Sequence, residues 1–344
     1  MINFRYHLVS LTGVFLALAL GIILGASVVD SGAVDGLRGQ LGSVKADVGR
    51  VDQQNAALRR DLDTWNEFAT KAGPGVLSGR LQGVPVLLLG MRGIDAEPVA
   101  DLRDDLLSAD ARLQGTVWLT SKLQLDNRED TAALSAAFGL ATNDAEVVRQ
   151  AVFNRLAIEL VAADEPSRAA TTTTVPAEVT VPTLPGVTTT LPTVAPRGGV
   201  LATLASLGFV SIDSPESGRF DANQPLAAGS RFVVASGEGA DVPDSAGAIP
   251  LVKALSAASG SSSRVLAVEP GKPSQGRDPE VRGRFIGPLR AESRTLDNRV
   301  STTNNIEDFR GRVAAVLALV DLGVGRVGHY GTGAGADRLV PESG

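Results

Sequence analysis

The stretch LVSLTGVFLALALGIILGASVV, residues 8–29, contains 22 residues and no charged side chain. As a helix it is long enough to cross the hydrocarbon core of a bilayer, which is about 30 Å thick. Arg5 precedes this stretch, whereas Asp30 and Asp35 follow it. Because Lys and Arg favour the cytoplasmic side, we expect residues 1–7 to form a cytoplasmic tail, residues 8–29 a transmembrane helix, and the rest to lie outside the cytoplasm.

A cleaved secretory signal is the alternative interpretation of the same stretch. Such signals have an apolar region of about 7–15 residues, followed by small residues at the cleavage site. The apolar run here is longer and has no clear cleavage site after it. The sequence therefore favours an uncleaved, single-pass anchor in the cell membrane.

Residues 30–72 carry a heptad repeat, in which apolar residues recur at alternating steps of four and three. Such a repeat predicts a left-handed coiled coil. The one polar residue in the seam is Asn55, at an a position, where it favours two parallel strands in one register. An Asn on a solvated helix face is the alternative. The predicted seam residues are Leu41, Val44, Val48, Val51, Asn55, Leu58, Leu62 and Trp65.

The membrane helix has a face of small residues. Gly13, Ala17, Gly21 and Gly25 are spaced by four, so they line one side of a helix. Such a face lets two helices approach closely in lipid. Gly and Ala are also common in membrane helices that do not pair. Since the adjacent heptad repeat independently indicates pairing, we predict a parallel homodimer.

Beyond residue 72 the pattern changes to alternating strands and helices. Gly73-Pro74-Gly75 is expected to end the stalk helix. The apolar runs at residues 83–89 and 116–120, with a helical pattern at 95–107 between them, predict a βαβ unit. The same alternation continues to the C-terminus, where we expect strands at residues 231–235 and 264–268 and a helix between them at 248–257. We therefore predict an α/β head, with helices on both faces of a mostly parallel sheet.

A Thr/Pro-rich segment at residues 165–197 interrupts the head. Its composition predicts an extended, disordered linker, with or without glycosylation. It separates a first half of the head, residues 80–164, from a second half, residues 198–340. The two halves either share one sheet, which we favour, or form two small domains.

Composition argues against two classes of function. The net charge is −6 and aromatic residues make up 4%, so we expect no binding to nucleic acid. No nucleophile elbow, phosphate loop or metal-spaced His pair is present, so we expect no enzymatic activity and no resident cofactor or metal. Residues 331–336, GTGAGA, match a dinucleotide fingerprint only superficially, because no room remains for the helix and strand that should follow.

Open parallel sheets bind ligands at the carboxyl ends of their strands. Polar residues follow several of the predicted strands, and we expect them to line a cleft at that edge. A lone His at a strand end is more often a packing residue than a ligand. The candidate cleft residues are Arg92, Ser236, Glu238, Thr303, Asn304 and His329.

Two runs of the sequence resemble a known family. They are NFRYHLVSLTGVFLALALGIILG, residues 3–25, and GRVAAVLALVDLGVGRVGHYGTG, residues 311–333. The family is an actinobacterial envelope family named after the mycobacterial copper transport protein MctB. The resemblance covers the anchor, the stalk and, more loosely, both halves of the head. It implies a role in copper homeostasis or efflux, with copper as a ligand. Some relatives imply instead a partner of another envelope membrane protein, in cell-wall assembly and division.

The residues themselves fit the second role better. Copper(I) prefers thiolate and thioether ligands, and imidazole suits copper generally. The chain has no Cys, two Met residues and two His residues. A single helix per chain encloses no pore, and its small-residue face carries no ionisable group to mark an ion path. The alternative function is therefore a non-catalytic dimeric scaffold or regulator, whose head lacks a high-affinity copper site.

Overall fold

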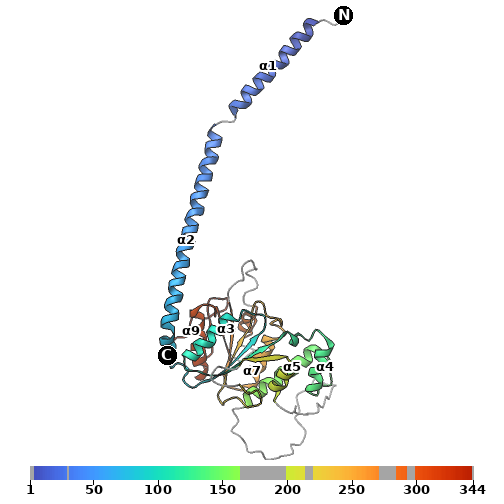
Figure 1. Ribbon diagram of the computed structural model, residues 1–344, viewed down its shortest axis with the longest axis vertical. Helices are drawn as coiled ribbons and strands as arrows, with labels where there is room; N and C mark the ends of the chain where they lie inside the picture. The colour runs from blue at the N-terminus through green and yellow to red at the C-terminus, as the bar shows by residue number, and fades with distance from the viewer. Residues whose placement is uncertain are drawn as a thin grey trace, which may run out of the picture. The chain divides into compact units, whose positions relative to one another are not determined.

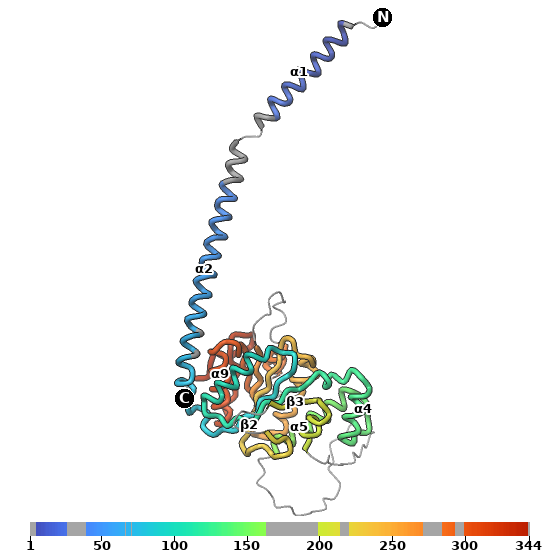
Figure 2. The backbone as a smooth tube through the Cα atoms, in the orientation of Figure 1, coloured from blue at the N-terminus to red at the C-terminus, as the bar shows by residue number. Residues whose placement is uncertain are grey.

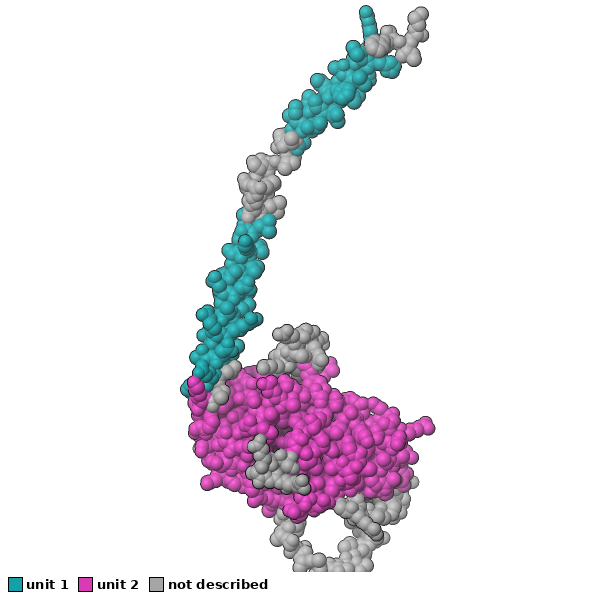
Figure 3. All heavy atoms as spheres, in the orientation of Figure 1, with its two compact units in different colours: residues 1–68 teal, residues 69–344 magenta. Residues whose placement is uncertain are grey.

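The computed structural model describes residues 4–28, 31–162, 199–213, 220–270, 284–292 and 299–342, with the backbone alone at residues 4, 26–28, 31–38, 66 and 70. The chain divides into two compact units, Met1–Phe68 and Ala69–Gly344 (Figure 3). The predicted linker at residues 165–197 lies outside the described residues. We describe each unit by itself.

The first unit begins with an apolar helix, α1 (Phe4–Val28) (Figure 1). Its segment Arg5–Gly25 has a mean hydropathy of 2.4, and none of it is buried by the rest of the chain. By length and composition this segment can cross a membrane. The predicted N-terminal apolar helix is therefore present.

A long helix, α2 (Ser31–Leu77), follows and contains 47 residues. The predicted seam side chains lie along it and are exposed, from 43% at Trp65 to 68% at Leu41. An exposed apolar stripe of this period is typical of a helix that pairs with another. The structure contains one chain, so the coiled coil itself stays a prediction.

The end of α2 differs from the prediction. The helix does not stop at Gly73-Pro74-Gly75 but continues to Leu77. Pro74 lies in the last turn, where its missing N–H removes a single helical hydrogen bond. Packing offsets that loss, because Ala69 and Leu77 are buried, and Gly73 lies against the ring of Phe309. The last turns of α2 are thus part of the second unit's core.

The second unit is built on one seven-stranded sheet with the order β3-β2-β1-β4-β5-β6-β7. All neighbouring strands are parallel except β2 and β3, which are antiparallel at one edge. These two strands are labelled in Figure 2. β1, before the Thr/Pro segment, pairs with β4, after it. One mostly parallel sheet is therefore confirmed, and two separate domains are excluded. The strands are β1 (Pro85–Met91), β2 (Arg112–Leu119), β3 (Val210–Asp213), β4 (Arg231–Ala235), β5 (Val265–Glu269), β6 (Val300–Asn304) and β7 (His329–Tyr330).

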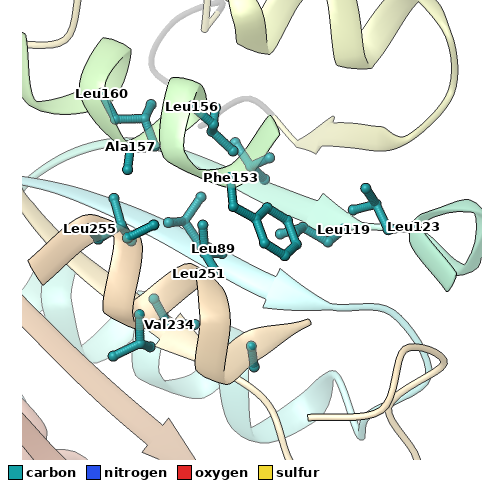
Figure 4. Close-up of a cluster of buried hydrophobic side chains, with 14 of the residues drawn as sticks. Leu89, Leu119, Leu123, Phe153, Leu156, Ala157, Leu160, Val234, Leu251 and Leu255 are labelled. Carbon is teal, nitrogen blue, oxygen red and sulfur yellow. The ribbon is translucent and has the colours of Figure 1, made fainter. Parts of the chain in front are cut away.

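Helices cover both faces of the sheet because successive strand residues point to opposite sides and both sides are apolar. In β1, Leu87 and Leu89 pack with the helices α4 to α8, whereas Val86 and Leu88 pack with α3, α9 and the end of α2. Figure 4 shows the first layer, where side chains of α5 and α7 meet Leu89. The helices are α3 (Glu97–Ser108), α4 (Arg128–Ala137), α5 (Ala145–Val161), α6 (Val200–Ser206), α7 (Ala248–Ala258), α8 (Ile286–Ala291) and α9 (Phe309–Gly323), with a 3₁₀ turn at Ser121–Gln124.

Candidate functional site

The direction in which the chain adds strands reverses between β1 and β4. From β1 the chain continues to β2 on one side, whereas from β4 it continues to β5 on the other side. In open α/β sheets such a switch point opens a crevice at the carboxyl ends of the strands. Here the loop after β1 and the loop after β4 pack against each other and close this crevice. Gly93 and Gly239 both have positive φ angles, 93° and 89°, and a Cβ on Gly93 would lie 2.2 Å from the Gly239 carbonyl oxygen. The Asp241 N–H also donates to the Arg92 carbonyl at 2.7 Å.

The larger cavity lies immediately beside this closed point. It has a volume of about 390 Å³ and is lined by the loop after β4, the first turn of α7, and residues before and within α8. Its ionisable side chains are Glu238, Asp244 and Arg284. The buried Ser236 hydroxyl donates to Oδ1 of Asp244 at 2.5 Å. Burial raises the pKa of Asp244, while the Ser236 hydrogen bond and the charge of Arg284 act in the opposite direction.

A smaller cavity of about 190 Å³ lies at the ends of β5 and β6. Its main cation is Arg290, whose guanidinium is engaged by the protein itself. Nε donates to Thr302 Oγ1 at 2.9 Å, Nη1 to the Ala334 carbonyl at 2.9 Å, and Nη2 to the Tyr330 carbonyl at 2.7 Å. Burial lowers the pKa of Arg290, against the charges of Glu269 and Asp337. Arg290 therefore holds the C-terminal segment against the sheet.

The Gly-rich segment at residues 331–336 wraps around this arginine and its neighbour Asn304. A Cβ on Gly331 would lie 1.9 Å from Asn304 Oδ1, and one on Gly333 would lie 2.6 Å from Asn304 Nδ2. Glycine is thus required by close packing against a side chain. This supports the structural interpretation of the segment and gives no support to a dinucleotide loop.

The structure does not bring the six candidate cleft residues into one cleft. Glu238 lines the larger cavity and Asn304 the smaller one. The remaining four line neither of these two cavities. Arg92 lies over the Trp118 ring, 4.9 Å from its centroid, and donates to Ser211 Oγ at 2.7 Å. Residues that follow neighbouring strands share an edge, but each loop then directs its side chains differently.

Thr303 and His329 line neither cavity, and they lie on opposite faces of the sheet, because it is Thr302, the neighbour of Thr303, that is in register with His329. Thr303 is fully buried and pairs in register with Val268 and Tyr330, which belong to the α9 side of the core. Its Oγ1 has no hydrogen-bond partner. His329 Nδ1 lies 3.0 Å from Thr302 Oγ1. Burial lowers the pKa of His329, with a smaller opposing effect from Asp337.

Sequence reasoning missed several polar residues of the cavities, among them Glu269, Asp244, Arg284 and Arg290. Glu269 directly follows the predicted strand at 264–268, so the rule on carboxyl ends contained the signal for it. Arg290 lies in α8, which has six residues and is too short to show a helical period. Asp244 lies in an irregular loop before α7, where no pattern marks it.

Metal-binding side chains are dispersed in the part of the chain that the structure describes. Among those residues, no group of three or more His, Cys, Asp or Glu is close enough to hold a metal ion. Met91 is fully buried in the core next to α7, and His329 is held by Thr302. Met91 and His329 thus lie on different strands and have different neighbours, and copper is considered below as a substrate.

The fold and these cavities define an α/β protein with one apolar N-terminal helix of membrane-spanning length and a mostly parallel sheet in its head. The chain belongs to the MctB family, described as copper transport outer membrane protein, whose model matches residues 1–341. It is 27% identical to proteins named copper transporter MctB from Mycobacterium tuberculosis and Mycobacterium bovis, over 98% of this chain and 98% of each relative. The Mycobacterium leprae protein of that name is 25% identical, over 99% of this chain and all of the relative. The family resemblance seen in the sequence is thus confirmed.

Proposed function

We propose that this protein acts in copper transport or copper homeostasis, as a membrane-anchored protein of the cell envelope. The family match carries this proposal, because it extends over residues 1–341 and so includes the apolar helix, the long helix and the head together. Relatives named copper transporter are aligned over almost their whole length, which further supports it. In this proposal α1 is an uncleaved anchor, with the N-terminus in the cytoplasm and the head outside.

The chain acts on copper together with other chains. One apolar helix cannot enclose a path for an ion, and its small-residue face has no ionisable group. A parallel homodimer brings two copies of α1 together, through Gly13, Ala17, Gly21 and Gly25, and pairs two copies of α2 through the exposed seam. A second envelope membrane protein then provides the path itself. In this arrangement the head is a non-catalytic module.

A scaffold or regulator of cell-wall assembly is the second candidate function. The dispersed His and Met residues favour it, because copper bound tightly by the head would need several soft or imidazole ligands together. A 47-residue helix between anchor and head also suits a protein that holds a partner at a distance from the membrane.

A deletion strain separates the two functions. In the copper role, loss of the gene raises sensitivity to copper salts and raises cell-associated copper, while zinc sensitivity and septum placement stay normal. Re-expression of the full chain restores both copper measurements. Normal copper tolerance together with misplaced septa would contradict the copper role and support the scaffold.

A further inference from the structure

The larger cavity has the position and size of a ligand site. It lies at the carboxyl edge of the sheet, next to the switch point between β1 and β4, where open α/β folds bind their ligands. Its volume of about 390 Å³ is near the lower end of the range for small-molecule sites, which is about 300–1,000 Å³. A ligand of a few to about a dozen heavy atoms suits that space.

Charges of both signs line this cavity. Glu238 and Asp244 come from the loop after β4, whereas Arg284 comes from the residues before α8. Ile249 and two prolines, Pro243 and Pro288, supply the apolar part of the wall. A ligand with only a cationic group would meet repulsion from Arg284, and a ligand with only an anionic group would meet repulsion from the two carboxylates.

We propose that this cavity binds a small zwitterion of the α-amino-acid type. The ammonium group lies toward Glu238 and Asp244, and the carboxylate pairs with the Arg284 guanidinium, which offers two parallel donors to it. The side chain of the ligand contacts Ile249 and the prolines. This site goes beyond the proposed function, since nothing in it depends on copper.

One wall of the site is held in place before a ligand arrives. The buried hydroxyl of Ser236 donates to Asp244 Oδ1 at 2.5 Å and so fixes that carboxylate. Gly237 beside it has a φ of 148°, and a Cβ there would lie 3.0 Å from Glu269 Cγ, so the loop is packed tightly against the end of β5. A fixed carboxylate loses little entropy on binding. The smaller cavity is a poorer ligand site, because the donors of its arginine are already used by Thr302 and by backbone carbonyls.

The test uses the full chain purified in detergent. The common L-amino acids are added singly at millimolar concentration, the unfolding temperature of the head is recorded, and each amino acid that raises it is titrated by calorimetry. Its amide, which lacks the carboxylate, and its N-acetyl derivative, which lacks the ammonium, are then titrated in the same way. We expect one or a few amino acids to bind, and both derivatives to bind about tenfold more weakly or not at all.

Variants then assign the two ends of the ligand. Asp244→Asn keeps the oxygen that accepts the Ser236 hydrogen bond, so the fold should persist, while affinity falls about tenfold. Arg284→Gln should lower the affinity for the parent amino acid, because the ligand carboxylate loses its partner, and should leave the affinity for the amide unchanged. Glu342→Gln alters an exposed side chain outside the cavity and should leave the affinity for the amino acid unchanged. The proposal would be overturned if none of the amino acids binds. It would also be overturned if either derivative binds as tightly as the parent amino acid, or if binding is unchanged in both cavity variants.

Discussion

Two neighbouring threonines of β6 show how differently one residue type is used in this core. Thr302 Oγ1 accepts a hydrogen bond from Arg290 Nε at 2.9 Å and lies 3.0 Å from His329 Nδ1. Thr303 is equally buried, but its Oγ1 has no partner and its neighbours in the adjacent strands are apolar. A buried hydroxyl without a partner costs about 1–3 kcal/mol of desolvation.

Replacing each threonine by valine should therefore have opposite effects. Thr303→Val removes the unpartnered hydroxyl at nearly constant shape, so the free energy of unfolding should stay equal or rise by up to about 1 kcal/mol. Thr302→Val is the matched control on the same strand and should lose about 1–3 kcal/mol, because it leaves the buried Arg290 short of an acceptor. Chemical denaturation of the two variants measures both changes. Destabilisation of similar size in both would show that Thr303 has a partner in solution.

His329 should give the head a pH dependence near neutrality. Burial lowers its folded-state pKa below the ordinary value of 6.5, so the unfolded chain takes up this proton more readily than the folded chain. The free energy of unfolding should then fall as the pH decreases from about 7 to about 5, and this loss should be smaller in His329→Gln. Asp105 and Asp244 cannot account for this loss. Burial raises their pKa values, so their contribution to the free energy of unfolding grows as the pH decreases. An identical slope in wild type and variant would assign the dependence to other groups.

At the level of elements, periodicity predicted most of the head, because its strands are short apolar runs and its longer helices span several turns. The strand predicted at 231–235 coincides with β4, and the helix predicted at 248–257 nearly coincides with α7. Three features were not predicted, each for a physical reason. α8 is too short to show a helical period, and the antiparallel direction of β3 depends on its pairing with β2, which is a tertiary contact. α2 continues past Pro74 because its last turn packs against the head.

The cleft was predicted less well than the sheet. The rule on carboxyl ends selects residues that follow strands, and it led to Glu238 and Asn304, which do line cavities. It cannot tell which way a loop turns, so it also selected Arg92, whose guanidinium packs on Trp118. It could not select Arg284 or Arg290, because residues before and within α8 reach the site only through the tertiary fold.

The two glycines at the end of α2 allow a direct test of how this helix joins the head. A Cβ on Gly73 would lie 2.7 Å from the Phe309 ring, whereas one on Gly75 would meet nothing within 4 Å. Gly73→Ala should therefore destabilise the head by about 1–3 kcal/mol through overpacking. Gly75→Ala should stabilise it by about 0.5–1 kcal/mol, because alanine favours the helix. Thermal unfolding of the two variants measures these changes. Equal shifts of the unfolding temperature in both variants would show that the last turn of α2 is not packed as described.

The seam of α2 predicts the behaviour of the isolated helix. A peptide of residues 30–71 should be helical and dimeric, more so at high concentration, because its apolar stripe is exposed in a single chain. Asn55→Leu should raise the stability of the dimer and weaken the preference for two strands, since a polar a position specifies register at a cost in stability. Circular dichroism and sedimentation equilibrium measure both properties. A peptide that stays monomeric at high concentration, with no crosslinking of the full chain in membranes, would exclude the homodimer and favour a stalk formed with another protein.

For the whole molecule, the decisive question is whether the head itself holds copper. Thiolate is absent from the chain, and Met91 and His329 are the thioether and imidazole of the head. Met91 is buried in the core on the α7 side, next to Gly247, while the His329 ring is held by Thr302 at the far strand of the sheet. Two ligands on separated elements leave a copper ion with too few donors. A symmetric dimer could still place two copies of His329 together, so that residue is the one to vary.

Copper titration of the head, residues 69–344, tests this conclusion, and the fragment begins at Ala69 because the last turns of α2 belong to the core. We expect calorimetry to show weak binding that does not change in His329→Ala, with His329→Gln as a control that keeps a polar side chain. Such a result would mean that copper is handled by the assembled membrane complex and not by the head. Tight stoichiometric binding that is lost in His329→Ala would contradict it, because a single imidazole per chain would then have to be completed by the second copy or by carboxylates. In that case the head would be a direct copper carrier, and its dimerisation would be a requirement of the metal site.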